Sequence, residues 1–220
     1  MEINPAFYAF DVKRLIGKEL NEIVVDPLWT FSVINYCEQI YFLFEDKYRF
    51  TKTRSAAYIS SYLLKEIKRK VEEFQGLILD GVVVTVPSSF TEKQKQEMIH
   101  ASGNAGCGVP YLLPEPIAAL IAYSYETNIP NGSITLLFDL GGGTTDICIS
   151  KIVENEIKVL IEMGDQFLGG KDFDKLLINH FNSILKKRYE LDVFATNKKF
   201  RLMIKCQEIK HTLSVNMDAK

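Results

Sequence analysis

Residues 136–148 read LLFDLGGGTTDIC. An apolar run breaks at Asp139, passes three glycines and two threonines, and resumes after Asp146. Because glycine has no Cβ, the N–H groups of residues 141–143 can converge into a concave nest that holds an anion. The stretch therefore predicts two strands joined by a turn whose backbone approaches a ligand closely. A plain glycine-rich hairpin with exposed acids is the alternative.

The two acids that flank this turn indicate which ligand it holds. Asp139 and Asp146 would repel a bare phosphate, but they fit a site in which a divalent cation lies between them and the phosphate. Magnesium binds carboxylates, water and phosphate oxygens together in this manner. Thr144 adds a hydroxyl group at the same rim. The stretch therefore points to a magnesium–nucleotide complex.

Two further stretches are candidates for the same site. Gly169 and Gly170 open a predicted helix at about 171–189, and a helix that begins after two glycines can receive an anion; a tight strand-to-helix turn is the alternative. Glu115 stands between two prolines at the predicted carboxyl end of a strand, where open α/β sheets place their sites. A simple charge in the first turn of a helix is the alternative for Glu115.

The remaining pattern predicts a mixed α/β chain. Apolar residues at helical spacing (Ile59, Leu63, Ile67, Val71, Phe74) predict a helix over 55–75. The unbroken run GVVVTVP (81–87) predicts a strand buried on both faces. Further predicted elements are a short helix at 10–20 with Gly17 near its end, two or three strands at 28–50, a helix from the Thr91–Gln94 capping box to 104–108, a strand at 111–116, a helix at 116–126, an antiparallel meander from 134 to 165, and a helix at 197–214.

Composition excludes several classes of protein. The chain has 220 residues and a net charge of −2, so nothing favours binding to nucleic acid or to an anionic membrane. Four cysteines lie far apart with no CxxC pair, which argues against a zinc site and favours a reducing, cytoplasmic setting. No apolar run approaches the roughly 20 residues that span a bilayer, and the N-terminus lacks a signal-peptide pattern.

Several stretches together resemble the nucleotide-binding domain of the seventy-kilodalton heat-shock chaperone family. They are VVVTVPSSFTEKQKQ, LLPEPIAALIAYSYE, LFDLGGGTTDICI, GDQFLGGKDFDKLLINHF and FDVKRLIGKEL, and they occur in the family's order over almost the whole chain. The resemblance implies an α/β, actin-like ATPase (ribonuclease H-like) fold with two lobes, each incomplete, and with Mg and ATP or ADP in the cleft.

The resemblance also implies a domain division. Residues 1–128 are expected to form the remainder of the first lobe, with a peripheral subdomain at 1–55 and a core subdomain at 56–128. Residues 129–220 would form part of the second lobe, with the meander and its phosphate loop at 129–168 and a helical subdomain at 169–220. The first lobe is expected to keep only two strands of its main sheet, with exposed edges.

The family's site residues carry over as follows. The resemblance places Gly141, Gly142, Gly143 and Thr144 on the nucleotide phosphates; Asp139, Asp146 and Glu115 on magnesium, largely through water; Gly169 and Gly170 at the start of the subdomain that covers the cleft; and Lys210 and Ser214 at the adenosine. Thr144, Asp139 and Glu115 have catalytic roles in the family. In QEIKHTLS (207–214), Gln207 replaces a family glutamate and His211 an arginine.

The sequence departs from the family pattern in ways that bear on activity. The family's first phosphate loop and catalytic lysine precede the stretch that begins here at Asn4-Pro5, and neither is found in this sequence. A later glycine–serine stretch, the linker and the client-binding domain are not found either. We therefore expect ATP binding with weak or no turnover. The alternatives are a non-catalytic interaction protein that modulates a full-length chaperone or its co-chaperones, and a fragment without a function of its own.

Overall fold

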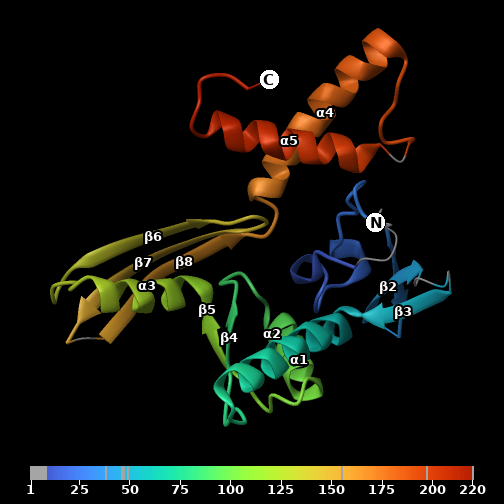
Figure 1. The fold of residues 1–220 in the computed structure, drawn as a ribbon. Helices are drawn as coiled ribbons and strands as arrows, with labels where there is room; N and C mark the ends of the chain where they lie inside the picture. The colour runs from blue at the N-terminus through green and yellow to red at the C-terminus, as the bar shows by residue number, and fades with distance from the viewer. Residues whose placement is uncertain are drawn as a thin grey trace.

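The structure is a computed structural model that describes residues 9–37, 39–45, 48, 50–154, 156–196 and 198–219. The Asn4-Pro5 pair lies outside the described residues. Three separate sheets alternate with helices along the chain, so the predicted α/β class is confirmed. Figure 1 shows α4 and α5 crossing above the N-terminal segment, with the other helices and sheets around and below them. Within the described residues no helix has the length and apolar character needed to cross a membrane.

The first body is built on a three-stranded antiparallel sheet. Its strands are β1 (Ser32–Tyr36), β2 (Gln39–Glu45) and β3 (Thr51–Ser55). The alternating pattern at 28–50 predicted β1 and β2, and β3 lies just beyond that range. Trp29 stacks on Phe31 with ring centroids 5.1 Å apart, and Phe31 meets Phe42 at 4.7 Å. These rings form the centre of the main hydrophobic core, which also takes in Leu15, Ile16, Ile40, Ala56, Val86 and Phe90.

The N-terminal segment forms tight turns where the sequence predicted a short helix. Only Val12–Arg14 and Leu20–Glu22 adopt helical turns, and both are 3₁₀ helices. Gly17 lies between them with φ +66°, a left-handed conformation that ends any right-handed helix. A Cβ at Gly17 would lie 2.6 Å from the Cα of Gln94, so the N-terminal segment turns where it packs closely against the helix that contains Gln94.

The helix α1 (Ala56–Gln75) has the predicted bounds. The Ser55 hydroxyl accepts a hydrogen bond from the Tyr58 N–H at its start, and Gly76 ends it with φ +73°. Its apolar stripe, however, is mostly exposed, and Phe74 is 94% exposed. The stripe predicted the helix correctly, yet within the described residues no other element covers most of its apolar side chains.

A two-stranded parallel sheet joins β4 (Val83–Val86) to β5 (Tyr111–Pro114), with α2 (Glu92–Asn104) between them. The Thr91–Gln94 capping box starts α2 as predicted. The prediction that β4 is buried on both faces is wrong, because Val83 is 60% exposed while Val84 and Val86 are buried. The described residues cover only one face of this pair of strands. The expected two-strand remnant with open edges is confirmed.

The helix α3 (Glu115–Glu126) leads into the predicted antiparallel meander. Its strands are β6 (Ile134–Leu140), β7 (Thr145–Val153) and β8 (Glu156–Asp165), in that order. The helix packs against β6 and β7, so one face of the meander is covered. The helices α4 (Gly170–Tyr189) and α5 (Lys199–Leu213) follow and pack on each other. The proposed division into lobes and subdomains remains a prediction.

Candidate functional site

The glycine turn closes the β6–β7 hairpin. Asp139 pairs with Asp146 across the two strands, and the Gly141 N–H donates to the Thr144 carbonyl at 2.9 Å. Among the described residues, no hydrogen bond uses the N–H groups of Gly142, Gly143 or Thr144. Three consecutive backbone donors are therefore available to an external acceptor at the tip of the hairpin.

The start of α4 supports this turn from behind. The N–H of Gly170 donates to the Gly141 carbonyl at 3.0 Å, and the N–H of Lys171 donates to the Gly142 carbonyl at 2.8 Å. A Cβ at Gly169 would lie 2.6 Å from the backbone N of Gly143, so no larger residue fits there. Gly169 and Gly170 thus hold the turn in place, and a direct contact of either with a ligand stays a prediction.

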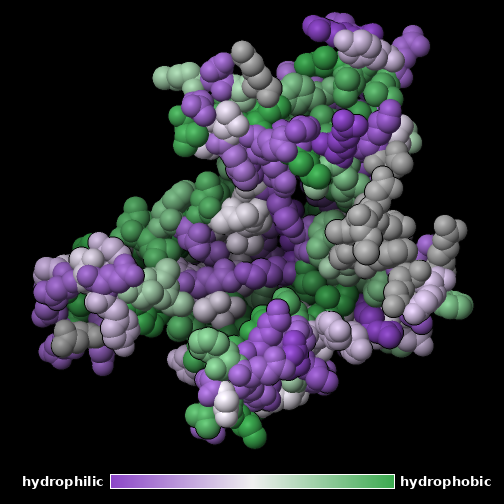
Figure 2. Space-filling view, in the orientation of Figure 1, coloured by the Kyte–Doolittle hydropathy of each residue, from purple (hydrophilic) through white to green (hydrophobic). Residues whose placement is uncertain are grey.

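The turn faces a cleft of about 820 Å³. The opposite walls come from the N-terminal segment, the first half of α1 and the start of α3. In Figure 2, hydrophilic side chains gather along the middle of the molecule, between the crossed helices and the sheets below. Of the predicted site residues, the cleft is lined by Glu115, Asp139, Gly141, Gly142, Gly143 and Thr144.

The third predicted acid, Asp146, lies beneath the cleft. It is 2% exposed and accepts a hydrogen bond from the Ser88 N–H at 3.1 Å. Burial raises the pKa of Asp146, and the nearby carboxylates of Glu115 and Asp139 raise it further. Burial and the two neighbouring carboxylates thus outweigh the Ser88 hydrogen bond and the charge of Lys13, both of which lower the pKa of Asp146.

The donor set fits a magnesium ion held through water. Within the described part of the chain, no three His, Cys, Asp or Glu side chains come close enough to ligate a metal directly. Carboxylates around a cleft that also offers backbone N–H donors suit a hydrated Mg²⁺ bound to phosphate, because Mg²⁺ keeps several of its waters. Glu115, Asp139 and Asp146 are the residues that would hold it.

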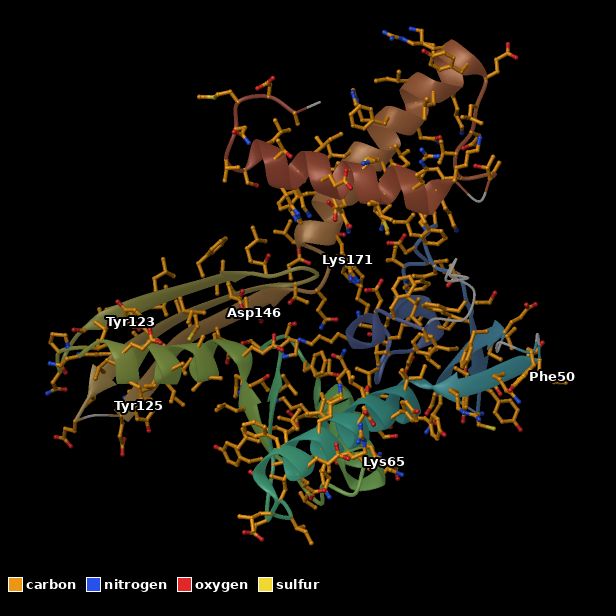
Figure 3. The ribbon with its side chains drawn as sticks, in the orientation of Figure 1. Phe50, Lys65, Tyr123, Tyr125, Asp146 and Lys171 are labelled. Atoms are coloured by element: carbon orange, nitrogen blue, oxygen red, sulfur yellow. The ribbon has the colours of Figure 1, made fainter. Side chains whose placement is uncertain are left out.

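A group of basic residues around the cleft was not predicted from the sequence. The ammonium of Lys13 lies 2.6 Å from Glu115, and the Arg14 guanidinium donates to the Gly143 carbonyl and to Asp172, both at 3.0 Å. Lys171 forms an ion pair with Asp11, and Figure 3 shows Lys171 at the base of α4, directed toward the N-terminal segment. The signal was the Lys-Arg pair within FDVKRLIGKEL. Spacing in the sequence does not show that this pair contacts a turn 129 residues away.

Lys210 and Ser214 lie apart from this cleft. They line a shallow hollow of about 340 Å³ on α4 and α5, whose other walls are Phe173, Leu176, Leu177 and Leu213. Lys210 donates to the Gly170 carbonyl at 3.0 Å and lies 2.8 Å from Asp174. Lys210 therefore connects the hollow to the segment that supports the glycine turn. The role of both residues at an adenosine stays a prediction.

Comparison with known proteins identifies what the chain resembles. The model of the Hsp70 protein family matches residues 1–220. The chain is 35% identical over 224 residues to heat shock cognate 70 kDa protein 3 of Dictyostelium discoideum, covering 99% of this chain and 36% of that protein. It is 36% identical over 217 residues to the heat shock 70 kDa protein of Emericella nidulans, covering 96% and 33%. The chain thus spans about a third of the length of these relatives.

Proposed function

Because the chain belongs to the Hsp70 protein family, whose members have an actin-like ATPase fold, we propose that it binds ATP or ADP with Mg²⁺ at the glycine turn, with weak or no turnover. The mixed α/β architecture, with three separate sheets, is consistent with two incomplete lobes of that fold. The match to the family model establishes the family and its fold. Nucleotide binding by this chain is the proposal.

One observation carries the proposal: the unused N–H groups of Gly142, Gly143 and Thr144 at the tip of the β6–β7 hairpin. Three consecutive amide donors at one turn can bind phosphate oxygens. Hydrogen bonds to a charged group contribute about 1.5–3 kcal/mol each. The turn is held in place by Gly141, Gly170 and Lys171 before any ligand arrives, so little ordering is needed on binding.

Magnesium would reconcile the acids with the phosphate. Asp139 and Glu115 line the cleft, and the charge of Asp146 acts from below. A bound Mg²⁺ supplies positive charge that bridges phosphate oxygens and the water shell. The ammonium of Lys13 forms an ion pair with Glu115. Because Lys13 is well exposed, it can move aside at small cost when Mg²⁺ binds.

Weak turnover follows from how the basic residues are used. A positive group accelerates phosphoryl transfer when it is free to meet the charge that develops on the phosphate. Two of the three basic groups of the cleft are held by other partners, Lys171 by Asp11 and Arg14 by Asp172 and the Gly143 carbonyl. Lys13, whose pair with Glu115 is exposed, is the third. We therefore expect binding without efficient hydrolysis.

The test is thermal unfolding of the 220-residue chain with Mg-ATP, Mg-ADP, or ATP and a chelator. A ligand at ten times its Kd adds about 1.4 kcal/mol to the free energy of unfolding, or roughly 3–6 °C in Tm for a chain of this size. The diagnostic variant is Gly142→Ala. The new Cβ meets no protein atom within 4 Å, and its backbone has no positive φ, so the fold should tolerate it. It would obstruct a phosphate that approaches the turn.

The matched control is Gly81→Ala, which also enters open space and lies outside the residues that line the cleft. We expect the Mg-ATP shift in the parent chain and in Gly81→Ala, its loss in Gly142→Ala, and a reduced dependence on Mg²⁺ in Asp139→Asn. A cooperative transition that nucleotide leaves unchanged would refute the proposal. A shift that survives in Gly142→Ala would place the nucleotide elsewhere.

A second candidate function has its own support. Large apolar side chains are exposed on α1 and on the meander, including Phe74, Leu136 and Phe138. Such surfaces are typical of interaction sites. We propose as the alternative a non-catalytic protein that modulates a full-length chaperone or its co-chaperones. Direct binding of the purified chain to a purified full-length Hsp70 protein, or to one of its nucleotide-exchange factors, would support it. The absence of binding to both would exclude it.

A further inference from the structure

One face of the meander is covered by α3, and the other, which we call the outer face, is open over its central rows; at the glycine-turn end Thr145 is buried and donates to the Leu168 carbonyl at 2.7 Å. The register of the strands places four rows of residues on the outer face. Strand partners in an antiparallel sheet share a face, so each row runs across β6, β7 and β8. The rows are Ile134–Lys151–Lys158, Leu136–Ile149–Ile161, Phe138–Ile147–Met163 and Leu140–Thr145–Asp165.

The two central rows are entirely apolar, and their outer strands are accessible to solvent. Leu136 is 69% exposed, Phe138 61%, Ile161 54% and Met163 58%. Figure 2 shows hydrophobic side chains gathered along the β6 side of the meander. A contiguous apolar patch of this kind on a sheet is rarely left in contact with water, because covering it is favourable in proportion to its area.

The two end rows carry opposite charge. Lys151 and Lys158 lie at one end of the outer face, and Asp165 lies at the other. All three are exposed, and within the described residues neither lysine forms an ion pair. The outer face is thus an apolar centre with a basic end and an acidic end, which is the pattern of a surface that is complementary to itself.

We propose that the outer face binds the outer face of a second copy of this chain, with a two-fold axis that runs across the strands between the two central rows. That rotation places each strand over its own copy in the opposite direction. Lys158 then lies over Asp165 of the second copy, Ile134 over Leu140, and each central row over the other. Two sheets packed in this way form a sandwich with an apolar interior about 10 Å thick.

The size of the face sets the strength of the association. Three strands about 4.8 Å apart and seven residues long cover roughly 14 Å by 23 Å. Specific interfaces of standard size bury about 800 Å² on each partner, and this face lies below that size. The dimer is therefore a concentration-dependent equilibrium in the micromolar range or weaker. Its fourth row, Leu140–Thr145–Asp165, borders the glycine turn, so association is measured without nucleotide.

The first test is sedimentation velocity of the purified chain over a wide range of protein concentration. We expect a shift from monomer to dimer, and no larger species, because the axis closes the assembly. The variant Leu136→Asp should weaken association by about a hundredfold or more, since it buries two unpaired charges in the apolar centre. The control Tyr125→Asp changes an 89% exposed aromatic residue of α3, the helix that covers the opposite face of the meander. It should leave association unchanged.

The second test distinguishes this arrangement from other pairings. Lys158→Glu alone and Asp165→Lys alone should each weaken the dimer, because each places like charges opposite one another. The double variant Lys158→Glu/Asp165→Lys should restore it. A chain that is monomeric at every concentration would overturn the proposal. So would a dimer that Leu136→Asp leaves intact, or one that the double variant fails to restore, as in pairing of the β6 edges.

Discussion

The chain contains two three-stranded antiparallel meanders that differ mainly in their surroundings. In the first, β1–β3, the central strand carries Phe42, which is completely buried in the main hydrophobic core, with its ring 4.7 Å from that of Phe31. In the second, β6–β8, a residue of equal apolar character such as Phe138 is largely exposed. Apolar side chains therefore contribute to stability here only where another element of the fold reaches them.

The main hydrophobic core and the candidate site also belong to different meanders. The main cluster of buried apolar residues centres on the packed N-terminal body, while the glycine turn projects from the less covered meander. Regions with few buried contacts open at lower free energy, and ligand-binding loops belong to this class. The predictions below test whether the two meanders differ in this way, and how strongly they are coupled.

The largest effect is expected from truncation in the packed meander. Phe42→Ala removes a fully buried ring and should lower the free energy of unfolding by about 3–5 kcal/mol. Leu136→Ala, in the open meander, should change it by less than about 0.5 kcal/mol. Chemical denaturation of both variants measures the contrast. Equal losses would show that the outer face of β6–β8 is buried in solution.

The next effect concerns the contact of the N-terminal segment with the glycine turn and the start of α4. Arg14 is buried and donates to the Gly143 carbonyl and to Asp172, so Arg14→Met leaves an acid without its partner. We expect a loss of about 2–3 kcal/mol in the free energy of unfolding, together with a weaker nucleotide shift.

Arg69→Met is the control for this prediction. Arg69 forms ion pairs with Glu66 and Glu73 on the exposed surface of α1, where such pairs contribute little. Its loss should cost less than about 1 kcal/mol in the same denaturation experiment. If Arg69→Met were as costly as Arg14→Met, burial would not explain the effect of Arg14.

A smaller effect of opposite sign is expected at Asp146. Because its pKa in the folded protein is raised above the ordinary value of 3.8, the folded state holds the proton more tightly than the unfolded chain. Stability therefore falls as the pH rises from that value through the raised pKa, and the ionised group destabilises the fold at neutral pH.

Asp146→Asn removes this charge, and its amide oxygen can still accept from the Ser88 N–H. We expect a higher Tm than that of the parent chain at neutral pH, with the difference shrinking as the pH is lowered toward 3.8. A Tm advantage that stays constant with pH would mean that Asp146 is not the titrating group.

The smallest effect is expected at Lys13, whose side chain is well exposed and pairs with Glu115. Lys13→Met frees this carboxylate, so the Mg²⁺ concentration for a half-maximal Mg-ATP shift should fall by a factor of up to about five. The variant Lys65→Met, an exposed lysine of α1 outside the cleft residues, should leave it unchanged. A higher Mg²⁺ requirement in Lys13→Met would indicate that Lys13 contacts the phosphate instead.

The sequence by itself determined the elements and the turn. Periodicity placed α1 and Gly76, the Thr91–Gln94 box started α2, and alternation gave the two meanders, because caps and side-chain periods act within a few residues. The glycines and acids of LFDLGGGTTDICI indicated an anion and metal site, because such a turn is also built from neighbouring residues. The motifs along the chain indicated the Hsp70 family, and the family model confirmed it.

Only the tertiary structure decided which faces are buried and which charges meet. Val83 and Phe74 looked like core residues and are exposed, because burial depends on partners that no local pattern specifies. Arg14 reaches Gly143 across 129 positions of sequence, and Gly17 turns because the backbone of α2 lies against it. Contacts between distant segments arise from packing of the whole chain, and a sequence read by period and spacing does not contain that information.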